Sequence, residues 1–413
     1  MSDAKPACRF CGTRLNHVFA DLGLSPLANR NLRPEEVASE KKYPLIARVC
    51  QACLLVQVDD SAPPEEIFSD YDYLSSATFG WVAHAGRYCR DMAARFGLGR
   101  ESFVVEIASN DGYLLRHFVD MGVPVLGVEP AANVAKLAIA AGVPTEAAFF
   151  GARAAREIAS RGRKADLMVA NNVLAHAPDT RDFAAGFAEL LAPGGVATFE
   201  FPHVMNLIER IQFDTIYHEH FFYLSLFAVE NIMRSAGLRV FDGQELSTHG
   251  GSLRLFVCHE KAAHTETAGL AALRRKERDR KLDALDGYMG FDARIEAVKV
   301  SFLAFLARAE SEGKKVAGYG AAAKGNTFLN YCEVSYPRLR EIYDRSERKR
   351  GKLTPGSHIP IAPPDRVAET KPDYVVILPW NIADEVRANM AFVSRWGGRF
   401  VTAVPETVVY DKD

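Results

Sequence analysis

The amino-acid sequence predicts an α/β protein in which a small cysteine-rich domain precedes two Rossmann-like units. Two stretches, beginning at residues 104 and 315, each have the pattern of a buried strand, a turn of small and polar residues, and a helix. That order is the repeating unit of a parallel sheet. Ahead of both stretches, two Cys-x-x-Cys pairs lie within the first 53 residues. Paired motifs of this kind are typical of a small domain built around a metal ion.

Length and charge limit the classes of protein. A chain of 413 residues exceeds one ordinary domain, and we expect three, at residues 1–70, 71–262 and 263–413. Lys and Arg number 50 and Asp and Glu 52, so the net charge of −2 gives no general attraction to nucleic acid or to an anionic membrane. No segment has the length and apolarity to span a bilayer, and no signal-peptide pattern follows Met1. We expect a cytoplasmic protein without nucleic-acid or membrane partners, and its oligomeric state stays open, a monomer included.

The four paired cysteines are the most specific local signal. Two Cys-x-x-Cys turns can place four thiolates tetrahedrally around one zinc ion. A redox pair is the alternative, but it opens a helix in a βαβ unit and needs no duplicate. Because cysteine fills every position, the predicted zinc site is closed and structural. Its expected ligands are Cys8, Cys11, Cys50 and Cys53, and the core thiols are expected to be Cys89, Cys258 and Cys332.

The first strand–turn–helix unit has the features of an adenosyl-binding site. Its turn, residues 108–112, holds too little glycine to grip a pyrophosphate, but it can pass under an adenosyl group. Glu129 follows the next strand, 123–128, where a carboxylate can accept both ribose hydroxyls. An ordinary α/β turn remains the alternative for the first loop alone, since Ala108 replaces its usual first glycine. Together with the asparagines after a strand at 165–170, the pattern predicts S-adenosylmethionine bound by Glu106, Ala108, Asn110, Asp111, Gly112, Glu129, Pro130, Asn171 and Asn172.

A run of polar residues at 217–220, with the sequence YHEH, predicts an active site. Four proton-transfer or hydrogen-bonding side chains stand in a row among phenylalanines. A zinc site is one alternative, but the run lacks the His-x-x-x-His spacing that puts two imidazoles on one helical face. A buried structural histidine is the other. Upstream, the tyrosine-rich stretch 68–78 precedes a helix near 80–96 and is either an exposed linker or a lid over a ligand.

The C-terminal part combines connector helices with a second α/β unit. Residues 265–313 have helical spacing of apolar residues, and their charge run at 274–281 is typical of a solvated face. The turn after the strand at 315 resembles half of a dinucleotide fold, so NAD is an alternative ligand. However, Ala323 replaces the third glycine, and Lys324 indicates a diphosphate neutralised by a cation. Further strands are expected at 339–343, before Asp344, and at 374–378, before Trp380, which can stack on a base or simply pack.

Taken in this order, the motifs resemble the zinc-containing sugar C-methyltransferases, which transfer a methyl group from S-adenosylmethionine to a carbon of a nucleotide-linked keto-deoxysugar. The resemblance covers nearly the whole chain. It rests on the four cysteines and on residues 71–76, 106–112, 171–176, 200–203, 217–220, 249–252, 318–327 and 355–360. It implies a zinc-binding domain, a central Rossmann-like class I methyltransferase domain and a C-terminal Rossmann-like domain. It also implies that a sugar nucleotide, most commonly carried by dTDP, lies between the last two.

The resemblance implies that Tyr217, Glu219 and His220 lie at the reacting sugar, with Tyr73 approaching from the N-terminal side. Methyl transfer to carbon needs a base to remove a proton beside the carbonyl and a donor to hold the enolate oxygen. His220 is the expected base because its ordinary pKa is about 6.5; Glu219 orients it or is the base itself. The candidate donors are Tyr217, His176 and His203. The expected substrate contacts are His203, Gly251, Gly320, Lys324, Asn326, Asp344 and Trp380.

Two other classes of enzyme remain open at this point. An RNA-modifying methyltransferase could grip nucleic acid with its zinc turns, but it should have a basic N-terminal face. The acidic stretch 59–72 argues against that class. An NAD-dependent oxidoreductase is the weaker alternative. The identity of the sugar, the methylated carbon and the final product are not specified by the sequence.

Overall fold

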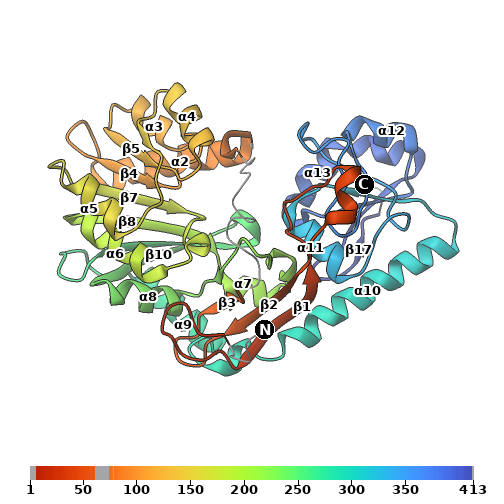
Figure 1. Ribbon diagram of the computed structural model, residues 1–413, viewed down its shortest axis with the longest axis horizontal. Helices are drawn as coiled ribbons and strands as arrows, with labels where there is room; N and C mark the ends of the chain where they lie inside the picture. The colour runs from red at the N-terminus through yellow and green to blue at the C-terminus, as the bar shows by residue number, and fades with distance from the viewer. Residues whose placement is uncertain (1–5, 61–73, 78, 412–413) are drawn as a thin grey trace.

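The computed structural model describes residues 6–60, 74–77 and 79–411, which are organised by three sheets. Figure 1 shows the central sheet with its helices as one lobe and the C-terminal sheet as another. The strands of the N-terminal sheet lie below them, and the long helix α10 (Phe291–Ser311) runs toward the C-terminal lobe. Within the described residues, no helix combines the length and apolarity needed to cross a membrane.

The N-terminal sheet is antiparallel and takes one strand from elsewhere in the chain. Its elements are β1 (His17–Ser25), η1 (Pro34–Ser39), β2 (Tyr43–Val49), β3 (Val56–Val58) and β9 (Phe222–Tyr223). The strand order is β1-β2-β3-β9. The alternating residues Leu45, Ala47 and Val49 of β2 are fully buried, as expected for a strand with one face on a core. The sheet thus continues beyond residue 70, because β9 follows the polar run at 217–220.

The central domain is built on a seven-stranded sheet. Its strands are β4 (Val104–Ile107), β5 (Val125–Val128), β6 (Thr145–Glu146), β7 (Ala165–Asn171), β8 (Leu191–Pro202), β10 (Leu238–Leu246) and β11 (Ser252–His259). Their order is β10-β11-β8-β7-β4-β5-β6, and β11 runs antiparallel to both of its neighbours. The chain order reverses between β4 and β7, which creates a topological switch point at the carboxyl ends of these strands. The predicted Rossmann-like central domain is confirmed.

Helices cover both faces of this central sheet (Figure 1). The helical segments of this part of the chain are η2 (Ser75–Ala77), α2 (Phe79–Phe96), α3 (Leu115–Asp120), α4 (Ala132–Ala140), α5 (Ala152–Ala159), η3 (Leu174–His176), α6 (Thr180–Leu190), α7 (Val204–Glu209), η4 (Phe213–Thr215), α8 (Leu226–Ser235) and η5 (Thr248–Gly250). Local signals fix several of their ends. Asp179 caps α6 and Ser225 caps α8 through side-chain oxygens that accept backbone N–H groups. The helix predicted near 80–96 is α2.

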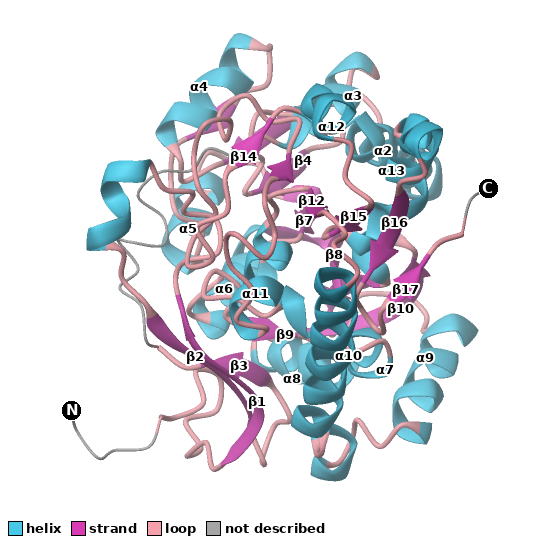
Figure 2. Cartoon of the chain, turned by 90° about the vertical axis from the view of Figure 1, so that its right-hand side faces the viewer, coloured by secondary structure: helices cyan, strands magenta, loops and turns pink. Residues whose placement is uncertain are grey.

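The C-terminal domain has a six-stranded sheet in the order β14-β13-β12-β15-β16-β17. Its strands are β12 (Val316–Tyr319), β13 (Ile342–Tyr343), β14 (Ile361–Ala362), β15 (Tyr374–Ile377), β16 (Arg399–Thr402) and β17 (Val408–Val409). Its helices are α11 (Ala323–Tyr331), η7 (Pro364–Arg366), α12 (Val367–Thr370), η8 (Trp380–Ile382), α13 (Ala383–Asn389) and η9 (Ala391–Trp396). Figure 2 labels α11, α12 and α13. Counted within the domain, this is the Rossmann order 3-2-1-4-5-6. The strand predicted at 339–343 is shorter than expected.

Connector helices join the two larger sheets. They are α9 (Ala268–Asp279), η6 (Leu285–Tyr288) and α10. Phe291 of α10 stacks on Phe19 of β1 with ring centroids 4.7 Å apart, within a core cluster that continues into the C-terminal sheet. The charge run at 274–281 is not entirely solvated, because Glu277 is 3% exposed. Its carboxylate accepts the N–H groups that open α8, so α9 is fixed to the central domain.

Candidate active site and metal centre

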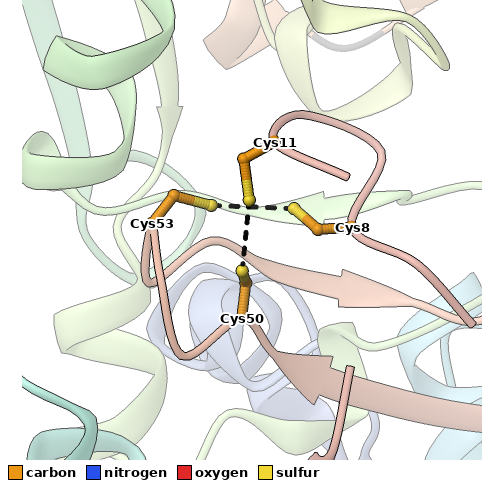
Figure 3. Close-up of side chains that lie close together, drawn as sticks. All are labelled: Cys8, Cys11, Cys50 and Cys53. Carbon is orange, nitrogen blue, oxygen red and sulfur yellow. Dashed lines mark hydrogen bonds between the residues drawn. The ribbon is translucent and has the colours of Figure 1, made fainter. Parts of the chain in front are cut away.

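The four predicted metal ligands meet at one point. The sulfur atoms of Cys8, Cys11, Cys50 and Cys53 all lie within 4.8 Å of one another. Figure 3 shows the four side chains converging from two turns. Sulfurs bound tetrahedrally at about 2.3 Å from one zinc ion are about 3.8 Å apart; here the Cys11 and Cys50 sulfurs are 3.5 Å apart and those of Cys8 and Cys53 are 3.6 Å apart. The Cys50 and Cys8 sulfurs and burial raise the pKa of the Cys53 thiol. Four thiolates can coexist there only around a cation, so the site fits zinc.

The two cysteine turns share one backbone conformation. The N–H groups of Gly12 and Leu54 each donate to the carbonyl of the first cysteine of their pair, at 2.9 and 2.8 Å. Both residues are left-handed, with φ of 76° and 58°. Sequence reasoning missed Gln57 of β3, whose side-chain N–H donates to the Cys8 sulfur at 3.2 Å. Such outer hydrogen bonds orient metal ligands.

The metal centre also fastens the N-terminal domain to the central one. The Arg181 side chain of α6 donates to the Phe10 carbonyl at 2.6 Å, and its guanidinium lies over the Phe10 ring. Beyond the cysteines, the Val58 N–H donates to the Phe221 carbonyl at 3.0 Å, and β3 pairs with β9. The zinc-binding domain therefore holds the strand that directly follows the polar run at 217–220.

The predicted cofactor loops lie together at the carboxyl ends of β4, β5 and β7. These strands are adjacent and parallel, so the turns after them share one edge of the sheet. Glu129 is 3% exposed and accepts the N–H groups of Asn110 and Ala131 at 2.9 and 2.8 Å. Pro130 lies between Glu129 and Ala131 in the chain, and it is exposed at the start of the turn into α4. Glu129 thus joins the two loops that the sequence predicted separately.

The backbone of the first loop explains its departure from the usual glycine pattern. Ala108 and Asn110 are both left-handed, with φ of 52° and 51°. Alanine therefore keeps the turn that glycine adopts more easily, at a cost in strain that is typical of functional loops. Gly112 has φ of 78°, and a Cβ there would approach Val143 to 2.9 Å. Glycine is required at 112 but not at 108.

Buried polar atoms at this edge provide a test of whether it suits a polar ligand. Within the described residues, no hydrogen-bond partner is present for Glu106 Oε2, Ser109 Oγ, Asp111 Oδ1 or Asn171 Oδ1. Burial, and then the charges of Glu129 and Asp111, raise the pKa of Glu106 well above its usual range. Buried polar atoms without partners cost free energy. The edge is therefore suited to a ligand rich in hydroxyl and amino groups, as S-adenosylmethionine is.

The tyrosine-rich stretch before α2 reaches this site at its end. The backbone N–H groups of Ser75 and Ser76 donate to the side chains of Asn110 and Asp111, at 2.9 and 3.3 Å. The end of the stretch therefore covers the cofactor loop. Tyr73, predicted to approach the sugar, lies outside the described residues.

A buried network beside the cofactor loops was missed as a site by sequence reasoning. Glu200, at the end of β8, is fully buried and accepts hydrogen bonds from Arg254 at 2.7 Å and from the Thr248 hydroxyl at 3.1 Å. It also lies 3.0 Å from His84 Nε2, and the Trp81 ring stacks on His84. Burial alone would raise the pKa of Glu200, but the hydrogen bond from His84 and the charge of Arg254 lower it. The network ties α2 to β8 and β11.

Asn172 and His249 connect that network to the proton-transfer groups. Asn172 Nδ2 lies 3.3 Å from His249 Nε2, and both residues are left-handed, with φ of 57° and 53°. Burial and the charge of Lys324 lower the pKa of His249 to about 4. Two strained residues in contact across a site are a recognised mark of functional geometry. Asn172 was predicted as a cofactor contact, whereas His249 was not singled out.

The polar run at 217–220 is a tight turn whose side chains point in different directions. The backbone N–H of His220 donates to the backbone carbonyl of Tyr217 at 3.0 Å and closes the turn. The Tyr217 hydroxyl lies 2.9 Å from His220 Nε2, with ring centroids 4.0 Å apart. His218 is 3% exposed, and its Nε2 lies 3.2 Å from the Pro44 carbonyl oxygen. His218 therefore packs in the core, as the alternative interpretation of a buried histidine describes.

Glu219 and His176 complete this cluster. The His176 ring packs against His220 at 4.7 Å, and His176 Nδ1 lies 2.7 Å from the Glu219 carbonyl oxygen. Burial, and then the charges of His176, His249 and Lys324, lower the pKa of His220 well below its usual value. Burial raises the pKa of Glu219 to about 7. A carboxyl group with that pKa can accept and release a proton at neutral pH.

Lys324 brings the C-terminal domain to the same cluster. Its Nζ lies 2.6 Å from Asn381 Oδ1 and 4.6 Å from the centre of the Trp380 ring. The Trp380 indole N–H donates to Asp214 Oδ2 at 2.7 Å. Asp214, which precedes the polar run in the chain, was not predicted; burial raises its pKa to about 6, opposed by the charge of Lys324. Since Lys324 also lowers the pKa of His220, groups of both domains act on one site.

Two predicted glycine contacts pack against protein. Gly320 has φ of 87°, and a Cβ there would approach Pro379 to 2.6 Å. A Cβ at Gly251 would approach Asn206 to 2.5 Å. Both glycines permit close packing of loops at the site, and the structure gives neither an open face toward a ligand.

Asn326 and Asp344 also have structural partners. Asn326 is 1% exposed and donates its side-chain N–H to the Ala28 carbonyl at 2.7 Å. Asp344 accepts the N–H groups of Ala321 and Ser346, each at 2.8 Å. Asn326 joins the N-terminal and C-terminal domains, and Asp344 fixes the turn after β12.

His203, predicted as a substrate contact and a candidate donor, has a structural partner in the structure. His203 is 1% exposed, and its Nε2 lies 2.7 Å from the Glu277 carboxylate. The same carboxylate accepts the N–H groups at the start of α8, so His203 Nε2 has a structural partner. Its role is to satisfy a buried carboxylate, a partner 74 positions away that no local pattern reveals.

Family models match three consecutive parts of the chain. They are a zinc binding domain at residues 8–68, a methyltransferase domain at 81–242 and a C-methyltransferase C-terminal domain at 247–405. The chain is also 36% identical to the C-methyltransferase NovU of Streptomyces niveus over 400 residues, which cover 97% of this chain and 95% of that one. The chain belongs to this C-methyltransferase family. The predicted α/β fold class, the cofactor S-adenosylmethionine and the structural zinc are thereby confirmed.

Solved structures similar to part of this C-methyltransferase are distant in sequence. The PH0226 protein of Pyrococcus horikoshii is 12% identical and covers 48% of this chain and 100% of its own, with a TM-score of 0.39. Magnesium protoporphyrin IX methyltransferase of Synechocystis is 15% identical and covers 47% of this chain and 91% of its own, with a TM-score of 0.34. The strand order of the central sheet is what defines its Rossmann-like fold.

Proposed function

We propose that this C-methyltransferase methylates a carbon beside the keto group of a nucleotide diphosphate deoxysugar, with dTDP as the carrier. The observation that carries the proposal is the contact between Lys324 and Trp380 of the C-terminal domain and Asp214 of the central one. One end of the site offers a cation and an aromatic ring, and the other offers proton-transfer groups. A nucleotide-linked keto-sugar matches both ends, because its diphosphate and base suit the first and its acidic carbon suits the second.

The C-terminal sheet supports the nucleotide part of the proposal. Lys324 and Trp380 follow β12 and β15, which are adjacent at the switch point of the sheet. Ligands of open parallel sheets bind in the crevice at this point. The family resemblance supports a sugar over an RNA substrate, and the similarity to NovU supports methyl transfer to carbon.

Geometry favours Glu219 as the base, whereas the sequence favours His220. The Thr215 carbonyl accepts a hydrogen bond from the His220 ring, so Nε2 accepts from the Tyr217 hydroxyl. Glu219, with a pKa of about 7, is the better matched acceptor at neutral pH. Its carboxylate would take the proton beside the carbonyl while the electron pair of that C–H bond moves onto the carbonyl oxygen. The Tyr217 hydroxyl has a single proton, so it would turn from His220 Nε2 and donate that proton to the resulting enolate oxygen.

The remaining parts of the site hold the cofactor and exclude water. Glu129, Asp111 and Asn171 would bind S-adenosylmethionine, which supplies the electrophilic methyl group for the enolate carbon. The proton on Glu219 then leaves to solvent, which restores the carboxylate. Trp81 and the end of the tyrosine-rich stretch lie over the cofactor loops and shield the reacting groups.

A substrate panel tests the reaction. Purified protein and S-adenosylmethionine are incubated with dTDP-linked and GDP-linked keto-deoxysugars and with RNA, and products are measured by mass spectrometry. We expect a methylated dTDP-sugar. Methylated RNA, or no methylated sugar nucleotide of any kind, would overturn the proposal.

Exchange of the sugar's acidic proton with deuterated solvent tests the base. Glu219→Gln should abolish this exchange. His220→Asn should lower methyl transfer by roughly two to four orders of magnitude, the usual contribution of a side chain that assists proton transfer. The variant should retain slow exchange. If Glu219→Gln exchanges the proton at the wild-type rate, the role of base returns to His220.

A further inference from the structure

An asparagine of the N-terminal domain contacts the carboxylate at the centre of the proposed chemistry. Asn29 Nδ2 donates to Glu219 Oε2 at 2.5 Å, and the Asn29 backbone forms a second hydrogen bond to the same carboxylate. Both contacts favour the ionised form of Glu219 and oppose the effect of burial. The other titratable groups around this turn are Tyr217, His220, Tyr223 and His176, with Lys324 beyond His220.

The loop that carries Asn29 is attached to the C-terminal domain on both sides. Just before it, the Ala28 carbonyl accepts the Asn326 side chain of α11 at 2.7 Å. Just after it, Leu32 and Leu353 exchange two backbone hydrogen bonds, at 2.9 and 2.7 Å. Figure 1 shows the red segment that follows β1 lying against the blue C-terminal lobe. The loop is therefore N-terminal in sequence, but its hydrogen bonds attach it to the C-terminal domain.

A buried carboxylate strengthens this attachment. Glu40, after η1, accepts the Gly356 N–H at 2.7 Å and lies 2.8 Å from His358 Nε2. Its side chain is only 6% exposed. The segment from Ala28 to Glu40 is thus fastened to the C-terminal domain at three places, and Asn29 is its contact with the central domain.

We propose that Asn29 is a positioning residue that couples the placement of the C-terminal domain to the catalytic carboxylate of Glu219. The inference rests on the proposed function, in which Glu219 is the base and the C-terminal domain binds the nucleotide. When that domain is in place, the amide of Asn29 donates to Glu219 and stabilises its ionised form, which is the form that accepts a proton. When the domain is displaced, the carboxylate loses these donors and holds its proton. Substrate bound across the two domains thus meets a base of which a larger fraction is ionised.

Asn29→Ala tests the coupling through its pH dependence. Without the side-chain donor, the pKa of Glu219 should rise from about 7 by about one unit. At pH 7 the ionised fraction and kcat/KM should then fall about fivefold, and at pH 9 both should nearly match the wild type. Asn389→Ala, an exposed site at the end of α13, is the matched control and should change neither. A merely structural defect would lower kcat/KM equally at every pH.

Infrared titration of the carboxyl groups provides a reading that needs no substrate. The band that titrates near pH 7 is assigned to Glu219 by its loss in Glu219→Gln. This band should shift to higher pH in Asn29→Ala, and further in Asn29→Asp, where a second carboxylate faces Glu219. An unshifted band in both variants overturns the role of Asn29. A wild-type protein that methylates no sugar nucleotide would instead overturn the proposed function, while the titration would still decide the role of Asn29.

Discussion

Glu219 and His220 are neighbours in one turn, and burial moves their pKa values in opposite directions. Burial disfavours the charged form of any group, so the carboxyl gains affinity for a proton and the imidazole loses it. Near neutral pH, His220 is uncharged and Glu219 is balanced between its two forms. The same buried environment thus keeps His220 neutral as a hydrogen-bonding partner and makes Glu219 a proton acceptor near neutral pH. The two side chains do not form an ion pair.

The pKa of Glu219 has a consequence for stability. Because it rises from 4.5 to about 7, the folded chain keeps a proton that the unfolded chain has lost. Stability should therefore fall as the pH rises through this window, by up to about 3 kcal/mol. Glu219→Gln removes this penalty, so its urea midpoint should exceed that of the wild type at pH 8 and be close to it at pH 5. The exposed Glu266→Gln serves as a control. An equal midpoint difference at both pH values would contradict the assignment.

Lys324 is predicted to bind the diphosphate of the substrate. Lys324→Ala removes one charge-assisted contact, worth about 1.5–3 kcal/mol, so substrate affinity should fall roughly tenfold to a hundredfold. Binding of S-adenosylmethionine to the central domain should hardly change. Calorimetric titration of both ligands measures these effects, with Lys314→Ala, a surface ion pair of the same domain, as the control. Equal loss of both affinities would show that Lys324 acts through folding.

At the scale of elements, two buried clusters join segments that are far apart in the chain. One is the cysteine centre, which connects the N-terminal turns and lies against α6. Cys50→Ser is expected to lose zinc and to unfold the N-terminal domain at lower urea concentration, because binding of a structural metal is also folding free energy. Metal analysis should give about one zinc per chain for the wild type and for Cys89→Ala, which changes a core thiol. Full zinc content in Cys50→Ser would contradict the ligand set.

The other cluster is the Glu277 cap of α8. Glu277→Ala would leave two backbone N–H groups and the His203 ring without their buried acceptor. Each lost partner is costly, so the free energy of unfolding should fall by about 2–4 kcal/mol in total. Glu266→Ala, in an exposed pair with Arg274, should cost less than about 1 kcal/mol. Urea unfolding followed by circular dichroism compares the two, and similar losses would contradict the cap.

These elements show what the sequence could predict and why the rest stayed hidden. The cysteine turns, the strands of both larger sheets and the cofactor loops follow from patterns within about ten residues, where local physics decides the structure. Glu277 looks like part of a solvated charge run, and its burial depends on helix α8, 51 positions away. Asn29 lies 190 positions from Glu219. His203 is predicted as a substrate contact and a candidate donor, but its partner Glu277 lies 74 positions away, beyond the reach of any local pattern.

At the scale of the whole molecule, the three domains share strands and contacts instead of meeting at simple boundaries. The N-terminal sheet borrows β9, the central site uses Lys324, and the C-terminal domain holds the segment around Asn29. Activity should therefore depend on parts that never touch the reacting atoms.

Removal of zinc is the sharpest test of this dependence. A chelator that strips the metal should loosen β3 and with it β9, and so displace the turn at 217–220. We expect methyl transfer to fall by at least tenfold while S-adenosylmethionine, whose loops follow β4, β5 and β7 and not β9, loses little affinity. Turnover assays and calorimetry on the same stripped sample measure both, and restored zinc should restore turnover. Unchanged turnover without metal would separate the zinc centre from the site.

The borrowed strand β9 also sets an order of events during synthesis on the ribosome. β3 pairs with β2 on one side and with β9 on the other, and β9 is made more than 160 residues later. Until residues 222–223 emerge, the nascent N-terminal sheet presents an open edge that can pair with another chain. If the cysteine turns have already bound zinc, they would stabilise the incomplete sheet until β9 is synthesised. The zinc ion would then have its largest effect before synthesis of the chain is finished, when it would lower aggregation of the first sixty residues.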